Sequence, residues 1–92
     1  MTRDDAIKLI LDELDRAEKK FPNWPVDPVH AAAIVAEESG ELVKATMDWV
    51  YKGGEYEGEV EQEAVQTAAM ALRFLMRRSQ CIPRQYPGGR CE

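Results

Sequence analysis

Residues 28–51 of this chain read PVHAAAIVAEESGELVKATMDWVY, with apolar residues recurring every three or four positions. That period is typical of an amphipathic α-helix. Asp27-Pro28 supplies a cap and a first-turn proline, and Gly53-Gly54 interrupts the pattern at the other end. The apolar face comprises Ala31, Ile34, Val35, Leu42, Ala45, Thr46, Trp49 and Val50. A helix from about Pro28 to Tyr51 is about 36 Å long, which exceeds the core of a small monomer.

Two further helices are expected on either side of this one. Residues 2–20 carry an apolar stripe with acidic residues at its start. After a loop over residues 53–58 that reverses the chain, a third helix should run from about Glu59 to Arg78 or Gln80. The predicted core positions are Ile7, Ile10, Leu11, Leu14 and Ala17 in the first helix, and Val60, Ala64, Val65, Ala68, Ala69, Leu72, Leu75 and Met76 in the third. With no strand pattern, the sequence predicts an all-α, three-helix chain with two long antiparallel helices.

The length of 92 residues is that of one domain with a modest core. We expect a single all-α domain over residues 1–81 and a flexible C-terminal tail over residues 82–92, because the tail has little to bury. The two long helices have wide apolar faces and recurring alanines, which permit close helix approach. These features predict a homodimer or a dimer of dimers, in which the long helices form a four-helix-bundle core.

The composition excludes several classes of partner. Twelve basic against 17 acidic residues give a net charge of −5, which argues against general binding of nucleic acid or of an anionic membrane. No apolar run is long enough to cross a bilayer, and residues 1–10 do not resemble a signal peptide. We therefore expect a cytoplasmic protein. Cys81 and Cys91 have no CxxC spacing, so we expect reduced thiols and no structural zinc.

Two helical pairs, Glu38 with Glu41 and Glu63 with Gln66, are the candidate functional residues. Each pair is spaced i, i+3, so both members project from one face of a helix. Three carboxylates and an amide oxygen on facing helices provide the hard oxygen ligands that Mg²⁺ prefers, with Mn²⁺ as the alternative ion. Glu38 also lies within the apolar stripe, where an unpaired carboxylate is costly. The competing interpretation is a solvated acidic helix face, since glutamate is common on helices.

The letters EESGEL at residues 37–42, the Gly-Gly loop and EAVQ at residues 63–66 resemble the MazG-type branch of the all-α nucleoside triphosphate pyrophosphohydrolases. The resemblance covers roughly residues 29–75. It implies that Glu38, Glu41 and Glu63 bind magnesium. Gln66 stands where the family usually has Asp, and an amide lacks the charge of a carboxylate. Gln66 is then either a neutral ligand or a hydrogen-bonding partner of one.

The activity implied by this resemblance is hydrolysis of an NTP or dNTP to a monophosphate and pyrophosphate. Glu38 or Glu37 is the candidate base that accepts the proton of the attacking water. Two alternatives stay open. One is a catalytically silent helical module that binds nucleotides or dimerises, because the Asp is missing at position 66. The other is an enzyme with the same bundle and metal that acts on phosphoribosyl-ATP or a deoxyuridine nucleotide.

Four further residues are candidates for substrate binding. Lys44 and Lys52 are candidates for holding a phosphate, although Lys44 is also explained as a surface partner of Glu41 at i, i+3 and Lys52 as a charge at a helix C-terminus. Trp24 and Trp49 are candidates for stacking on a base, although each is also explained as a core or interface residue. His30, at a helix start, is expected to be a surface or capping residue.

Overall fold

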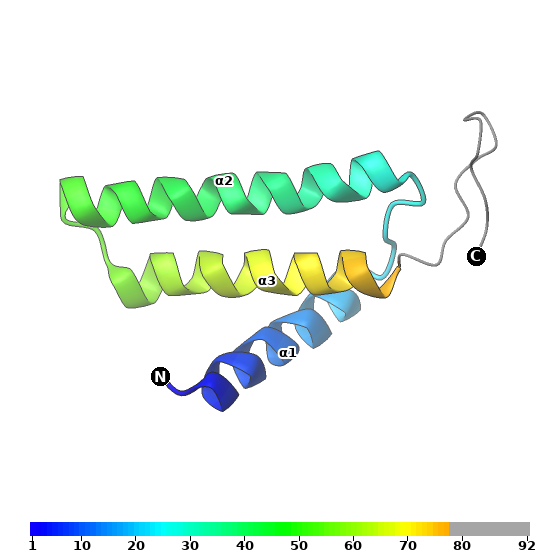
Figure 1. Ribbon diagram of the computed structural model, residues 1–92, viewed down its shortest axis with the longest axis horizontal. Helices are drawn as coiled ribbons and strands as arrows, with labels where there is room; N and C mark the ends of the chain where they lie inside the picture. Colours follow the sequence, from blue (N-terminus) through cyan, green and yellow to red (C-terminus); the bar gives the residue numbers. More distant parts are fainter. Residues whose placement is uncertain (78–92) are drawn as a thin grey trace.

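The computed structural model describes residues 1–77, which form three α-helices, α1 (Arg3–Lys20), α2 (Pro28–Lys52) and α3 (Glu61–Met76), and one short π-helix, η1 (Tyr56–Val60). The described part contains no strand, which confirms the all-α prediction. In Figure 1, α2 and α3 lie side by side and antiparallel, and α1 runs obliquely against α3. Because α3 packs against both other helices while α1 and α2 do not pack on each other, α3 is the central element.

Local signals near the N-terminal ends of α1 and α2 explain where these helices begin. Thr2 caps α1 by accepting a hydrogen bond from the Asp5 N–H, and the Asp5 side chain accepts one from the Thr2 N–H. Asp27 caps α2, with its Oδ1 2.9 Å from the Val29 nitrogen, and Pro28 occupies the first turn. The predicted cap at Asp27-Pro28 is therefore confirmed.

Two adjacent glycines end α2 by different means. Gly53 has φ of +73°, in the left-handed region that favours glycine. Gly54 donates its N–H to the Asp48 carbonyl oxygen at 3.0 Å, and a Cβ at Gly54 would lie 3.2 Å from the Asp48 carbonyl carbon. The chain then reverses and enters η1, where Tyr56 packs on Trp49 with 4.9 Å between ring centroids.

The predicted connection between the long helices is wrong in part. Residues 53–58 were expected to be a loop, whereas helical structure already begins at Tyr56 as the wider turn of η1. The third helix ends at Met76, because the Arg77 N–H bonds to the Phe74 carbonyl in a tightened last turn. The predicted tail over residues 82–92 and the two cysteines lie outside the described residues.

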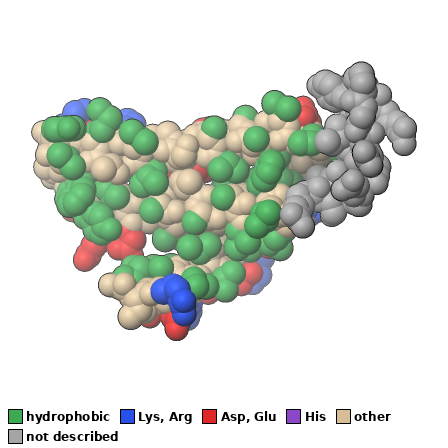
Figure 2. Space-filling model, in the orientation of Figure 1, with side chains coloured by type: hydrophobic (Ala, Val, Ile, Leu, Met, Phe, Trp, Pro, Cys, Tyr) green, Lys and Arg blue, Asp and Glu red, His purple; other side chains and the backbone are tan. Residues whose placement is uncertain are grey.

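The core of the single chain consists of small side chains and a few larger ones, and it leaves much apolar surface exposed. The buried hydrophobic residues are Leu14, Ala17, Ala31, Ala45, Val60 and Ala69. Seven predicted core residues are exposed instead: Ile7, Leu11, Trp49, Val50, Ala64, Leu75 and Met76. Figure 2 shows hydrophobic side chains along the length of α2 and around the junction of α1 with α3. These residues were expected to be buried, but three helices in one layer-like arrangement have too few neighbours to cover them. None of the helices within residues 1–77 is both long and apolar enough to span a bilayer.

Replacement of Gly53 should destabilise the fold in a residue-specific way. Gly53→Ala is expected to cost about 1 kcal/mol, because a Cβ is unfavourable at positive φ. In a domain of this size, that corresponds to a fall in Tm of about 4–8 °C. Gly53→Asn is the matched control and should lose less, because asparagine tolerates the left-handed region better. Thermal unfolding followed by circular dichroism tests this; equal Tm values for the two variants would contradict it.

Candidate metal centre and adjoining pockets

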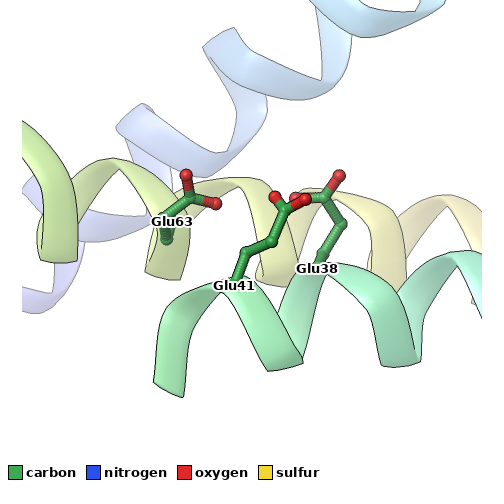
Figure 3. Close-up of side chains that lie close together, drawn as sticks. All are labelled: Glu38, Glu41 and Glu63. Atoms are coloured by element: carbon green, nitrogen blue, oxygen red, sulfur yellow. The ribbon is translucent and has the colours of Figure 1, made fainter. Parts of the chain in front are cut away.

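Three carboxylates from two helices meet at the α2–α3 contact. Glu38 and Glu41 come from α2 and Glu63 from α3, and one carboxylate oxygen of each lies within 4.8 Å of the others. Figure 3 shows the three side chains reaching to the same side of the helix pair. The structure therefore brings together the three glutamates that the sequence singled out, at a separation that one cation can bridge.

The local sequence explains why the carboxylates converge. Glu38 and Glu41 are spaced i, i+3 on α2, so their side chains leave the helix in neighbouring turns of one face. Ala45, one turn beyond Glu41, is buried, and so is Ala69 on α3. These small side chains keep the two helix backbones close, which brings Glu63 within reach of the α2 pair.

Two carboxylate oxygens at this site are buried without a hydrogen-bond partner. Glu38 Oε2 and Glu63 Oε2 accept no hydrogen bond from any of residues 1–77. An unsatisfied buried acceptor is costly, and the cost is larger for a charged group. A divalent cation supplies what both oxygens lack, so the donor set fits Mg²⁺ or Mn²⁺: oxygen atoms only, three negative charges, and room for further ligands.

Burial and like charge raise the pKa of two of the three glutamates. For Glu38, desolvation is the largest cause, followed by repulsion from Glu41, Glu63, Glu37 and Glu13. For Glu63, desolvation is again the largest cause of the raised pKa, followed by the charge of Glu41 and a side-chain hydrogen bond with it. Both pKa shifts have the same sense: the folded chain favours the protonated form of Glu38 and of Glu63.

Two pockets adjoin the carboxylates. The first, which we call the Trp24 pocket, has a volume of about 440 Å³ and touches the cluster at Glu38. Its lining comes from all three helices and from the segment between α1 and α2, and includes Trp24, Gln66 and Arg73. The second, which we call the acidic pocket, has a volume of about 540 Å³ and is lined by Glu41, Lys44, Ala45, Asp48, Glu59 and Glu63.

The remaining residues of the predicted acidic site occupy different places. Gln66 is half-buried and lines the Trp24 pocket together with Glu38. Glu37 is exposed, and it affects the site through its charge, which raises the pKa of Glu38. Glu59, which the sequence placed only at the start of the third helix, also lines the acidic pocket, one turn before Glu63.

The two candidate lysines share one partner. Lys44 Nζ lies 3.5 Å from Asp48 Oδ2, and Lys52 Nζ lies 3.4 Å from Asp48 Oδ1. Both lysine side chains are well exposed, so these ion pairs contribute little stability. Lys44 lines the acidic pocket beside Glu41 and Glu63, whereas Lys52 does not line either pocket that touches the carboxylates.

The two tryptophans are separated by the structure. Trp24 lines the pocket named after it, with its ring 4.8 Å from the Arg73 guanidinium carbon. Trp49 packs on Tyr56 near the other end of α2 and lines neither pocket that touches the carboxylates. His30 is exposed, as expected from the sequence, yet it also lines the Trp24 pocket.

Sequence reasoning missed two charged residues that surround the site. Glu13 of α1 lines the Trp24 pocket, raises the pKa of Glu38 and pairs with Arg16 at 2.6 Å. Arg73 of α3 is 3% exposed and donates from Nη2 to the Phe21 carbonyl oxygen. The sequence spacing could have indicated Arg73, because this residue lies ten positions beyond Glu63 on the same face of the helix.

No family model, no curated protein and no solved structure matches this chain. The MazG-type resemblance therefore rests on the motif residues alone, and the chemistry of the site rests on its own geometry.

The raised pKa values predict a stability that falls with pH when metal is removed. Between the ordinary glutamate pKa and the raised values, the folded chain binds more protons than the unfolded chain. Stability is therefore present at low pH and is lost as pH rises through this window. In EDTA, Tm should fall as the pH is raised above about 4.5.

Glu38→Gln should flatten this decline and raise Tm in EDTA at neutral pH, because it removes one of the crowded charges. Glu55→Gln is the matched control: Glu55 is exposed and makes no capping hydrogen bond, so its replacement should leave the pH profile unchanged. If Tm falls with pH as steeply in Glu38→Gln as in the parent chain, the pKa of Glu38 is not raised in the folded chain.

Proposed function

We propose that this chain is a metal-dependent nucleoside triphosphate pyrophosphohydrolase, which cleaves an NTP or dNTP to a monophosphate and pyrophosphate. The observation that carries the proposal is the pair of buried, unpartnered oxygens of Glu38 and Glu63, within a cluster of three carboxylates beside a pocket. The MazG-type resemblance of residues 37–42 and 63–66 names the reaction. The reaction also needs a cation, because three carboxylates repel an anionic polyphosphate.

Glu38, Glu41 and Glu63 would hold the metal. Bound Mg²⁺ neutralises polyphosphate charge and lowers the pKa of a bound water. The reaction forms one bond from the water oxygen to the α-phosphorus and breaks the bond from that phosphorus to the bridging oxygen, which leaves with pyrophosphate. A carboxylate accepts the proton of the water, and Glu38 or Glu37 takes this role.

Lys44 is the better placed of the two lysines for a phosphate. It lines the acidic pocket beside Glu41, and its side chain is exposed and held only by a long ion pair with Asp48. A phosphate oxygen competes well for such an ammonium group, because charge-assisted hydrogen bonds to phosphate are short and strong. Lys52 would contribute at longer range.

Gln66 favours one alternative function. With an amide in place of the family Asp, the site has three carboxylates instead of four. Metal affinity decreases when a charged ligand is lost. A catalytically silent module that binds nucleotides without cleaving them is therefore the second candidate. In that case the carboxylates would still bind a metal nucleotide, but turnover would be absent.

The decisive measurement is pyrophosphate release from a panel of nucleoside triphosphates, with Mg²⁺ and with EDTA. We expect release with Mg²⁺ only. Glu38→Gln and Glu63→Gln should each lower kcat/KM by about 10²-fold or more, because each removes a charged oxygen from the site. Glu55→Gln is the control and should retain the parent activity, since Glu55 lies in the exposed turn after α2.

Two further variants resolve the roles within the site. Glu37→Gln should lower kcat with little change in KM if Glu37 is the base, and should leave both nearly unchanged if Glu38 is. A folded parent chain that releases no pyrophosphate would contradict the hydrolase, and a gain of turnover in Gln66→Asp would then identify the silent module.

We also propose that the chain works as a homodimer, or a dimer of dimers, through the outer face of α2. Seven exposed small or apolar positions follow one another there at alternating steps of four and three residues: Val29, Ala33, Ala36, Gly40, Val43, Met47 and Val50. We call this stripe the α2 seam. Its repeat is that of the seam between paired helices, and a Cβ at Gly40 would touch nothing within the chain. The proposed occupant is the same seam of a second copy.

Val43→Lys should dissociate this assembly, because it places a charge in the middle of the α2 seam. Val43 is 57% exposed in the single chain, so the substitution has little reason to disturb the monomer. Val26→Lys is the matched control, at a valine that is 66% exposed and lies outside the seam. Light scattering gives the mass. A parent mass of 10.4 kDa would contradict the dimer.

A further inference from the structure

Arg73 has a hydrogen-bonding capacity that the described chain leaves unused. Arg73 is only 3% exposed. Its Nη2 donates to the Phe21 carbonyl oxygen, and its Nε–H has no acceptor within residues 1–77. No carboxylate of the described residues forms an ion pair with it. A buried guanidinium without an acceptor at Nε is costly, so an oxygen acceptor from a ligand would be stabilising there.

The position of Arg73 relative to the carboxylates defines the shape of that ligand. Glu63, Gln66, Met70 and Arg73 follow one face of α3, and the last three line the Trp24 pocket. Ten residues of helix separate Glu63 from Arg73, or about 15 Å. A ligand that spans the pocket therefore has its anionic end at the carboxylate cluster and its other end at Arg73 and Trp24.

The chemistry at the Arg73 end favours a flat, neutral group. Trp24 adds aromatic surface there, with one ring face against the Arg73 guanidinium, and Ile34, Met70 and Pro25 add apolar wall. A phosphate would lose its hydration in such surroundings, whereas a heteroaromatic ring would stack and keep one polar edge for a hydrogen bond. Guanidinium donors pair well with the carbonyl oxygen of a base, because that oxygen lies in the ring plane.

We propose that the Trp24 pocket binds the nucleobase of the substrate and that the Arg73 Nε–H donates to a ring carbonyl oxygen, which selects carbonyl-bearing bases against adenine. This inference rests on the proposed function, since it assigns the substrate class of the same site. Adenine is the only common base without a ring carbonyl. If adenine took the same position in the pocket, its 6-amino group, a donor, would face the Nε–H in place of the 6-oxo acceptor, and a site built around one hydrogen bond rejects such an analogue.

Binding of two free nucleosides to the whole chain, without metal, tests the proposal. Inosine and adenosine are a matched pair, because they differ at position 6 of the purine: inosine has an oxo group there and adenosine has an amino group. We expect inosine to bind at least about tenfold more tightly by calorimetry. In nitrogen-edited NMR spectra, inosine should shift the indole N–H signal of Trp24. The signal of Trp49, which packs on Tyr56 outside the pocket, is the internal control.

Arg73→Lys keeps the positive charge and removes the Nε–H, so it should erase the preference for inosine. Arg77→Lys, at an exposed arginine one turn further on, is the matched control and should keep it. Circular dichroism reports whether Arg73→Lys folds. If it does not, the comparison of the two nucleosides on the unaltered chain decides alone.

Three results would overturn the proposal: equal affinities for the two nucleosides, a preference that survives in folded Arg73→Lys, or no binding of either nucleoside. These results are independent of turnover, because no phosphate is present. Pyrophosphate release without nucleoside selectivity would leave the hydrolase intact and remove the role of Arg73. Selective nucleoside binding without pyrophosphate release would support the role of Arg73 and contradict the hydrolase.

Discussion

The contact between α2 and α3 carries three carboxylates, two of which hold one oxygen each away from water. Glu38 and Glu63 each bury one oxygen there without a hydrogen bond from the described chain, and Glu41 adds a third negative group within 4.8 Å. Apolar residues at these positions would stabilise the helix pair more, because buried charges are costly. The helices pack closely in spite of this cost because Ala45 and Ala69 bring the backbones together. The fold thus keeps three carboxylates close together at the cost of repulsion among them.

Features set by local sequence were predictable. The helix periods, the Asp27-Pro28 cap and the break at Gly53-Gly54 depend on residues within a turn or two of one another, and the structure agrees. The meeting of Glu38, Glu41 and Glu63 was also predictable, because the i, i+3 spacing fixes the face and the apolar stripes bring α2 and α3 together. Beyond this, Gln66 could be assigned to the site but not to a role.

Features set by long-range packing were not predictable. The hydrogen bond from Arg73 to the Phe21 carbonyl joins residues 52 positions apart, and nothing in either segment announces it. The oblique course of α1 brings Glu13 to the Trp24 pocket, whereas periodicity alone gave only the buried face of α1. Trp49 illustrates the same limit: its aromatic character suggested a stacking role, but the turn into η1 pairs it with Tyr56.

The central place of α3 has a consequence for the order in which the chain acquires its structure. During synthesis α1 emerges first, yet the helix it packs on, α3, is the last of the three to leave the ribosome. The neighbours α2, η1 and α3 form a hairpin from contacts close in sequence, which favours fast formation. Docking of α1 must close a much longer loop, at a greater entropic cost. The apolar side of α1 therefore remains without its partner until that hairpin exists, and the Trp24 pocket is completed only in that last step.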